Sequence, residues 1–315
     1  MLDCLVVGGG PAGLTAGIYA ARFRLRTTVV DAGESRAAQI PCTRNHAGFP
    51  GGIAGADLLH RMRIQAIQFG CVVRQGRVRA IDGKAGDFTA RLVDGAILRA
   101  RAIILSTGVS NHRPEIDDAL HSALLERGLL RYCPVCDGFE VIDHKVGVLG
   151  QGARALKEAT FLRAYTARVT IITPLADPDI DAEQRAMLAA IGVPVICGPV
   201  GDFQIWTDGL SLEAAGRRLT FEVIYAALGS TVHSGLAAVL GAGLTADGCI
   251  KVDTHQRTTV PGLYAAGDVV IGLDQISHAM GQAGVAATTL RNDLAATEPQ
   301  LRGPPEQAKH SCITP

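Results

Sequence analysis

The chain has 315 residues, of which 48% are hydrophobic and 4% aromatic, and its 30 basic and 30 acidic residues cancel. This balance of charge argues against nucleic acid and anionic membrane surfaces as partners. The length predicts two domains, and a composition rich in glycine and small aliphatic residues favours α/β units with buried parallel strands.

No segment of the sequence has the pattern of a signal peptide or a membrane helix. Met1 leads directly into an apolar strand without a basic leader, and apolar runs such as residues 102–105 are far shorter than the ~20 residues that span a bilayer. The 8 cysteines are mostly isolated, unlike those of a secreted disulfide framework. These features predict a cytoplasmic protein.

The N-terminal segment predicts a β-α-β unit that binds a dinucleotide. An apolar strand at residues 2–7 leads into an alanine-rich helix at 11–23 and a second strand that ends in Asp31. The G-x-G-x-x-G motif between them consists of Gly8, Gly10, Pro11, Ala12 and Gly13 with Gly9. Glycines let the backbone approach a pyrophosphate at the helix N-terminus, and Asp31 can accept hydrogen bonds from ribose hydroxyls but disfavours a 2′-phosphate. A tight turn without a ligand is the alternative.

Residues 77–101 predict a small β-meander inserted into this unit. Short alternating runs are separated by Asp82-Gly83 and Asp94-Gly95, which are typical of hairpin turns.

The strand-turn-helix pattern recurs in the middle of the chain. A strand at 145–149, a helix at 153–165 and a strand at 168–172 surround a G-x-G-x-x-A motif. Its key positions are Gly150, Gly152 and Ala155. A second dinucleotide unit is therefore expected, and a later apolar strand at 260–268 is expected to rejoin the first unit.

The segment Cys133-Pro134-Val135-Cys136 places two thiols at the spacing of a small disulfide ring. We interpret the pair as a redox centre. Two alternatives are a zinc site and two reduced core thiols. No second C-x-x-C pair exists for zinc, so we predict no metal site, and Pro134 with the following Asp137 indicates an exposed turn instead of a buried run.

The run from Cys133 to Phe139 resembles the C-x-x-C-D-G-(F/Y) signature of low-molecular-weight thioredoxin reductases. Further blocks similar to this family are Gly8 to Gly13, Gly48 to Gly51, Gly55 to Leu59, Ser106 to Gly108 and Ala266 to Asp268. The resemblance implies an α/β fold with two Rossmann-like dinucleotide-binding domains. Residues 1–113 and 249–315 would form the split FAD domain, and 114–248 the inserted pyridine-nucleotide-type domain that carries the cysteines.

The resemblance also implies roles for individual residues. Cys136 would lie against the flavin, Cys133 would attack an external disulfide, and Asp137 would move protons for the thiols. Asp268 would hold the flavin ribityl chain, while His278 is a candidate extra base. Other residues placed at the flavin in this way are Gln39, Asn45, Gly108, Gly267, Gln275 and Ile276, although Ala37 and Ala38 replace two glycines of the family's pattern before Gln39.

The second glycine motif lacks the neighbours that select a nucleotide. Residues 173–178 contain no arginines to clamp a 2′-phosphate, and the preceding strand does not end in an acid that would bind a ribose diol. The donor therefore stays open between NADPH, NADH and a reduced protein. Oxygen as the acceptor would make the chain a dithiol oxidase, and a flavin-bound redox sensor is the alternative from another class.

The expected partner is a thioredoxin-like protein or a small disulfide or dithiol, and the resemblance implies a homodimer. After Arg291 the chain turns polar without a periodic pattern, so we expect a frayed tail. Cys312 in this tail is interpreted as incidental.

Overall fold

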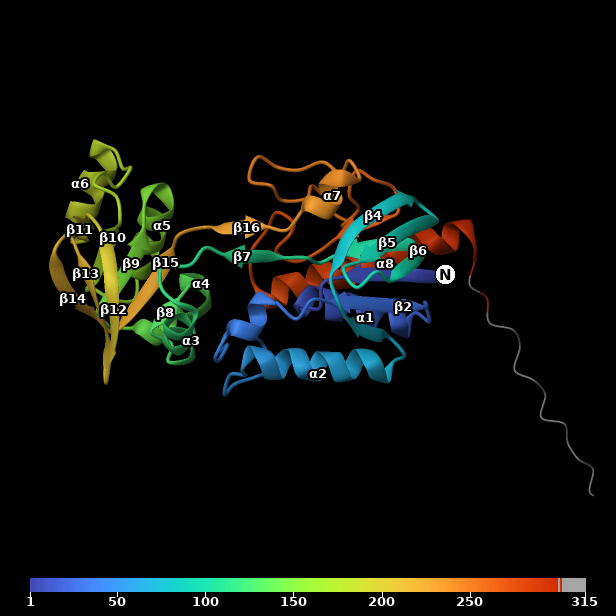
Figure 1. Ribbon diagram of the computed structural model, residues 1–315, viewed down its shortest axis with the longest axis horizontal. Helices are drawn as coiled ribbons and strands as arrows, with labels where there is room; N and C mark the ends of the chain where they lie inside the picture. Colours follow the sequence, from blue (N-terminus) through green and yellow to red (C-terminus); the bar gives the residue numbers. More distant parts are fainter. Residues whose placement is uncertain (300, 302–315) are drawn as a thin grey trace, which may run out of the picture.

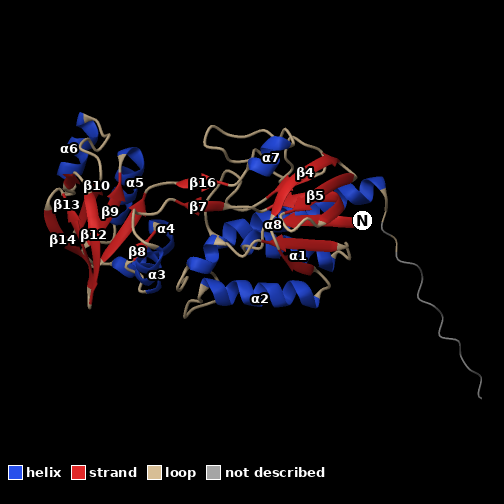
Figure 2. Ribbon diagram, viewed as in Figure 1, coloured by secondary structure: helices blue, strands red, loops and turns tan. Residues whose placement is uncertain are grey.

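Buried apolar strands and glycine turns determine the architecture of the chain. The computed structural model describes residues 1–299 and 301, which form two α/β lobes joined by a narrow ribbon (Figure 1). Strands form the centre of each lobe, and helices pack around them (Figure 2). The predicted α/β fold with two Rossmann-like units is confirmed.

The first lobe takes its elements from both ends of the chain. These are β1 (Leu2–Val7), α1 (Pro11–Arg22), β2 (Thr27–Asp31), the 3-10 turn η1 (Arg36–Gln39), α2 (Gly55–Gln68), β3 (Val72–Gln75), β4 (Val78–Lys84), β5 (Asp87–Leu92), β6 (Ile97–Leu105), α7 (Gly235–Val239), β17 (Leu263–Ala265) and α8 (Ile276–Thr297). Strands β3, β2, β1, β6 and β17 lie side by side in this order and run parallel. The expected return of the late strand to the first unit is therefore confirmed.

The predicted β-meander is present, and its last strand is shared with the parallel sheet. Residues 97–100 of β6 pair antiparallel with β5, and residues 100–105 pair parallel with β1. The turn at Asp94-Gly95 is confirmed. The turn expected at Asp82-Gly83 is wrong, because both residues remain paired in β4. The chain reverses instead at Ala85–Gly86, where Gly86 has φ +88 and supplies the left-handed backbone.

Small residues bring α1 and α8 close together against one face of this sheet. Ala16 and Ala20 of α1 and Ala283 and Ala287 of α8 belong to one buried cluster. A Cβ on Gly17 would lie 2.7 Å from a methyl carbon of Val29, so glycine permits this helix to approach β2. Of the helices in the described ranges, none is both long and apolar enough to cross a bilayer.

Helix α8 continues past the point where we expected the chain to fray. It ends at Thr297 instead of near Arg291. Leu294 packs against the buried cluster of α1 and α8, and Asp293 accepts hydrogen bonds from Arg257 and Tyr264. These contacts stabilise the last turns despite their polar composition. Cys312 lies outside the described residues.

The second lobe is built on a parallel sheet with the strand order β11-β10-β9-β15-β8. Its elements are α3 (Asp118–Glu126), β8 (Leu130–Arg131), α4 (Pro134–Asp137), the 3-10 turn η2 (Gly138–Val141), β9 (Val146–Gly150), α5 (Gly152–Leu162), β10 (Val169–Thr173), α6 (Ala182–Ala190), β11 (Val195–Cys197), β12 (Val200–Trp206), β13 (Gly209–Ala214), β14 (Arg217–Phe221) and β15 (Val223–Ala227). The expected second strand-turn-helix-strand unit is thus β9, α5 and β10. Strands β12 to β14 form a separate antiparallel sheet.

Two short antiparallel strands, β7 (Val109–Asn111) and β16 (Ser230–Val232), connect the lobes (Figure 1). The domain limits expected from the sequence, after residues 113 and 248, remain a prediction. Ala237 and Ala242 pack in the core of the first lobe beneath the meander, which favours a second limit near β16 over one at residue 248.

Candidate functional site

Cys133 and Cys136 form the predicted disulfide. Cys133 is the N-cap of α4, and Pro134 is the first residue of this short helix, where a missing N–H is tolerated. The Cys136 amide donates to the Cys133 sulfur over 3.2 Å. A backbone donor at this sulfur stabilises a thiolate once the disulfide is reduced.

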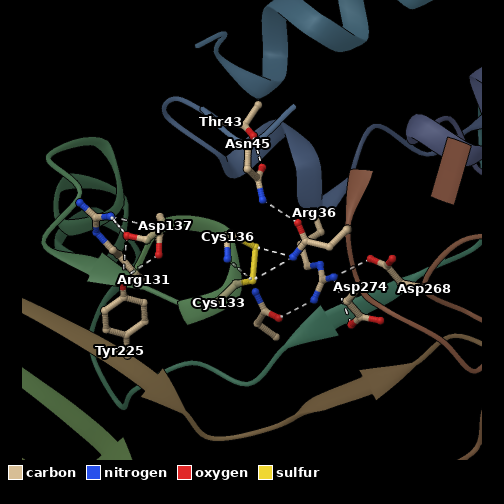
Figure 3. Close-up of a disulfide and its surroundings, with 12 residues drawn as sticks. Arg36, Thr43, Asn45, Arg131, Cys133, Cys136, Asp137, Tyr225, Asp268 and Asp274 are labelled. Carbon is tan, nitrogen blue, oxygen red and sulfur yellow. Dashed lines mark hydrogen bonds and ion pairs between the residues drawn. A yellow bond between two sulfur atoms is a disulfide. The ribbon is translucent and has the colours of Figure 1, made fainter. Parts of the chain in front are cut away.

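Asp137 follows the pair and points its carboxylate toward Arg131 and Tyr225 (Figure 3). The Tyr225 hydroxyl donates to the carboxylate over 2.7 Å, and Arg131 forms an ion pair with it at 3.2 Å. Burial raises the pKa of Asp137, although the charge of Arg131 and the hydroxyl of Tyr225 act in the opposite direction. Burial also raises the pKa of Tyr225, and the nearby Asp137 carboxylate adds to this effect. The tyrosine therefore acts as a hydrogen-bond donor.

Gln275, the N-cap of α8, contacts the disulfide from the first lobe. Its side-chain nitrogen lies 3.1 Å from the Cys136 sulfur and 3.4 Å from the Cys133 sulfur. Asn45 donates to the Gln275 side-chain oxygen over 2.8 Å and accepts from the Thr43 hydroxyl over 3.0 Å. This series of hydrogen bonds directs the Gln275 N–H groups to the sulfurs and links the two lobes at the disulfide.

Arg36 on η1 connects several polar groups near the disulfide (Figure 3). It donates to Asp268 over 2.6 Å, and to Asp274 and Asn111 over 3.2 Å each. Burial raises the pKa of Asp268, while the charge of Arg36 opposes this rise. Arg36 thus fixes the carboxylate that the family resemblance places at the flavin ribityl chain.

The first glycine motif has the geometry that dinucleotide binding requires. Gly8 has φ +112, and a Cβ there would lie 2.2 Å from the Ser106 carbonyl oxygen. A Cβ on Gly13 would lie 1.8 Å from the Gly8 carbonyl oxygen, so α1 packs directly on the turn. The N-terminus of α1 has neither a side-chain cap nor an acidic residue in its first turn. Its N–H groups are therefore available to a pyrophosphate.

Asp31 completes this arrangement at the end of β2. It is buried, accepts from the Gly33 amide over 2.9 Å and pairs with Arg63. A carboxylate held at this position accepts hydrogen bonds from ribose hydroxyls. The residues of the first glycine motif therefore fit the adenosine diphosphate part of FAD.

A cavity of about 1490 Å³ extends from this glycine turn to the disulfide. Sites for small ligands usually enclose about 300–1,000 Å³, so the cavity has room for a dinucleotide. The predicted site residues that line it are Gly8, Gly10, Pro11, Ala12, Asp31, Gln39, Asn45, Gly108, Cys133, Cys136, Asp137, Gly267, Asp268, Gln275 and Ile276.

The remaining predicted residues lie outside the lining of this cavity. Gly13 lies in the first turn of α1, where it packs against the Gly8 carbonyl oxygen. Gly150, Gly152 and Ala155 lie at the start of α5, where Ala155 is buried and the Gly152 amide already donates to a backbone carbonyl. His278 is exposed on α8, beside Gly272. Its role as a base stays a prediction.

Arg131, Tyr225 and Arg36 were not among the residues selected from the sequence. Tyr225 lies 88 positions after Asp137, and Arg36 lies 232 positions before Asp268, so no local pattern relates them. Arg131 could have been identified from the sequence, because it stands two positions before Cys133. A cation at that position can pair with the acid that follows the cysteines.

Comparison with known proteins agrees with this geometry. The family model described as pyridine nucleotide-disulphide oxidoreductase matches residues 2–283. The thioredoxin reductase of Listeria monocytogenes is 33% identical over 90% of this chain and 91% of its own length. That of Streptomyces coelicolor is 31% identical over 95% of this chain and 94% of its own length.

A solved structure extends this similarity to the fold. The thioredoxin reductase of Streptococcus pyogenes superposes with a TM-score of 0.86 at 26% identity, covering 94% of this chain and 99% of that protein. A coverage this large requires that both lobes are included. The chain therefore belongs to the pyridine nucleotide-disulphide oxidoreductase family and is an FAD-dependent disulfide oxidoreductase of the thioredoxin reductase type.

Proposed function

We propose that this enzyme reduces the disulfide of a thioredoxin-like protein or of a small molecule through Cys133 and Cys136. The observation that carries the proposal is that the two cysteines line the same cavity as the first glycine motif. Gly8, Gly10, Asp31 and Asp268 would hold FAD, which would supply the electron pair for reduction of the Cys133–Cys136 disulfide.

The reduced cysteines act in sequence on the substrate. The Cys133 thiolate attacks one substrate sulfur, a mixed disulfide forms, and the second substrate sulfur leaves and takes a proton. The Cys136 thiolate then attacks the Cys133 sulfur, which restores the ring and releases the first substrate sulfur as a thiol. Two electrons pass from the pair to the substrate. The Cys136 amide at the Cys133 sulfur supports Cys133 as the attacking residue.

Asp137 holds and moves the proton that these steps require. Its carboxyl is half-buried, and partial desolvation raises its pKa, so it takes up a proton more readily than an exposed aspartate. Tyr225 and Arg131 fix its orientation through hydrogen bonds. Gln275 keeps the disulfide against the first lobe between turnovers.

Several wider properties belong to the same proposal. NADPH or NADH is the electron donor and binds to the second lobe, whereas FAD binds to the first lobe, which includes α7 and α8. The enzyme is a cytoplasmic homodimer. The free cysteines of the described chain support a reducing compartment, and they are Cys4, Cys42, Cys71, Cys197 and Cys249. Light scattering of the full chain tests the dimer.

Replacement of each redox cysteine by serine tests the function. Cys133→Ser and Cys136→Ser should retain the yellow flavin but lose disulfide turnover, whereas Cys42→Ser, at a free cysteine in the same cavity, should retain both. Anaerobic stopped-flow bleaching of the flavin then compares NADPH, NADH and a small dithiol as donors. Bleaching by the dithiol alone would indicate a dithiol oxidase and contradict the proposed direction of electron flow.

A further inference from the structure

The segment after β10 folds back over the second glycine motif. The carbonyl oxygen of Pro178 accepts from the Gly152 amide over 2.9 Å. Pro178 is buried, and Ile180 packs against the buried cluster that contains Ala155. We call residues 174–180 the cover. It uses a backbone donor at the start of α5, where the pyrophosphate of a dinucleotide binds in a Rossmann unit.

Asp179 places a carboxylate at the same point. A Cβ on Gly152 would lie 3.1 Å from an Asp179 carboxylate oxygen. Asp179 has φ +55, a left-handed conformation that aspartate adopts more readily than most residues. Its amide donates to the Asp177 carboxylate over 3.1 Å, which stabilises this local turn. The chain thus supplies its own anion beside the N-terminus of α5.

The cover also carries two acids and no base. Asp177 pairs with Arg185 of α6 at 3.4 Å, and Asp179 is the second acid. The carboxylate of Asp181 is occupied as the cap of α6. A diphosphate at the start of α5 would therefore meet the Asp179 carboxylate, and a 2′-phosphate would add to this repulsion.

The first glycine motif gives an internal comparison. Gly10 is the counterpart of Gly152, and a Cβ on it would lie 3.1 Å from the Ser35 hydroxyl oxygen. A neutral hydroxyl therefore stands where Asp179 stands in the second motif. Within the described ranges the amides of Gly9 and Gly10 donate to no protein acceptor, and both residues line the large cavity. The two motifs share a sequence pattern, but only the second is covered.

We propose that Asp179 is a specificity-determining residue, and that nucleotides bind the second motif only when the cover opens. The carboxylate and the Pro178 carbonyl compete with the diphosphate for the start of α5, and NADPH is disfavoured more than NADH because of its extra phosphate. This inference rests on the proposed function, since it concerns the donor of that reaction.

Isothermal titration of NADP⁺ and NAD⁺ into the oxidised, FAD-loaded enzyme tests the inference without electron transfer. Asp179→Asn removes the charge and keeps a residue that tolerates the left-handed backbone. It should bind NAD⁺ about fivefold more tightly than the natural protein, as expected for one like-charge contact near the surface, and the affinity for NADP⁺ should increase by a larger factor. The gain should shrink in about 1 M salt. Asp208→Asn, at an exposed acid in the turn between β12 and β13, is the matched control and should change neither affinity.

A second variant at the same position tests whether the change in affinity could arise from misfolding of the first. Asp179→Gly relieves the left-handed conformation at no steric cost and should give the same direction of change, with flavin content and thermal unfolding as checks. Equal nucleotide affinities in the natural protein and both variants would overturn the inference, whether binding is tight or absent. That outcome leaves the proposed function standing, because the function is tested separately by the cysteine variants. Tighter binding without disulfide turnover would support the inference and contradict the function.

Discussion

Glu158 on α5 gives the stability of the second lobe a pH dependence that can be predicted. Its side chain lines the large cavity, and one carboxylate oxygen is buried without a hydrogen-bond partner among the described residues. Burial raises the pKa of Glu158 to about 7 from its ordinary value of 4.5, although Arg154 and Lys157 oppose this. The carboxyl therefore prefers to hold a proton in the folded protein.

The sign and size of the effect follow from proton linkage. Between pH 4.5 and 7 the folded state binds more protons than the unfolded state, so the free energy of unfolding falls as pH rises. Below pH 4.5 both states are protonated and the effect vanishes. Above pH 7 it reaches its full value, about 3 kcal/mol from a shift of about 2.5 units at 1.36 kcal/mol each. Glu158→Gln should abolish this decrease in the free energy of unfolding, because glutamine does not titrate.

Urea unfolding at pH 5 and pH 8 measures the effect. The only tryptophan of the chain, Trp206, lies on β12 and reports on the second lobe. The glutamine variant should gain up to about 3 kcal/mol over the natural protein at pH 8 and much less at pH 5. Glu213→Gln, at an exposed glutamate of β13, should change little at either pH. A gain that is equal at both pH values would refute the reasoning.

Two further variants probe the site. Gly13→Ala would place a Cβ within 1.8 Å of the Gly8 carbonyl oxygen, so the glycine turn must open. The purified variant should therefore carry less flavin per chain, as measured from its absorption spectrum. A full flavin content would contradict the assigned contact. Tyr225→Phe removes the donor that favours the charged form of Asp137, so the pKa of Asp137 should rise further, by about one unit. The acid limb of the turnover-pH profile should shift upward by the same amount, and an unchanged profile would exclude Asp137 from the rate-limiting proton step.

The parallel strands and their glycine turns were predictable because their patterns are local. Buried strands such as β1 and β9 consist mostly of apolar residues, and each is followed by a turn that requires glycine. The first hairpin of the meander was misplaced for a related reason. Gly83 and Gly86 both tolerate a left-handed backbone, and the sequence alone does not show that pairing continues to Lys84 and Asp87.

In the functional site too, the features that depend on local spacing could be predicted, and those that depend on contacts between distant residues could not. The cysteine pair could be identified from its spacing, and most of the residues taken from the family resemblance line the cavity. Arg36 and Tyr225 were missed because their partners are distant in the sequence and their contacts depend on how the lobes fold. The tail was expected to fray after Arg291, but α8 continues to Thr297 because Asp293, which is polar in the sequence, pairs with Arg257 in the fold.

The two glycine motifs show that a dinucleotide-binding sequence pattern predicts the backbone conformation of the turn more reliably than it predicts whether a ligand binds there. In both, glycines produce the same turn from a strand into a helix, and this geometry follows from steric limits on the turn itself. Whether the N–H groups of the helix are available depends on the segment after the next strand. After β2 that segment places the Ser35 hydroxyl near Gly10, whereas after β10 it places Asp179 and the Pro178 carbonyl at Gly152. The residues that distinguish the motifs therefore lie more than 20 positions downstream of each turn, and the comparison of these downstream segments, more than the glycines, separates an accessible nucleotide loop from a covered one.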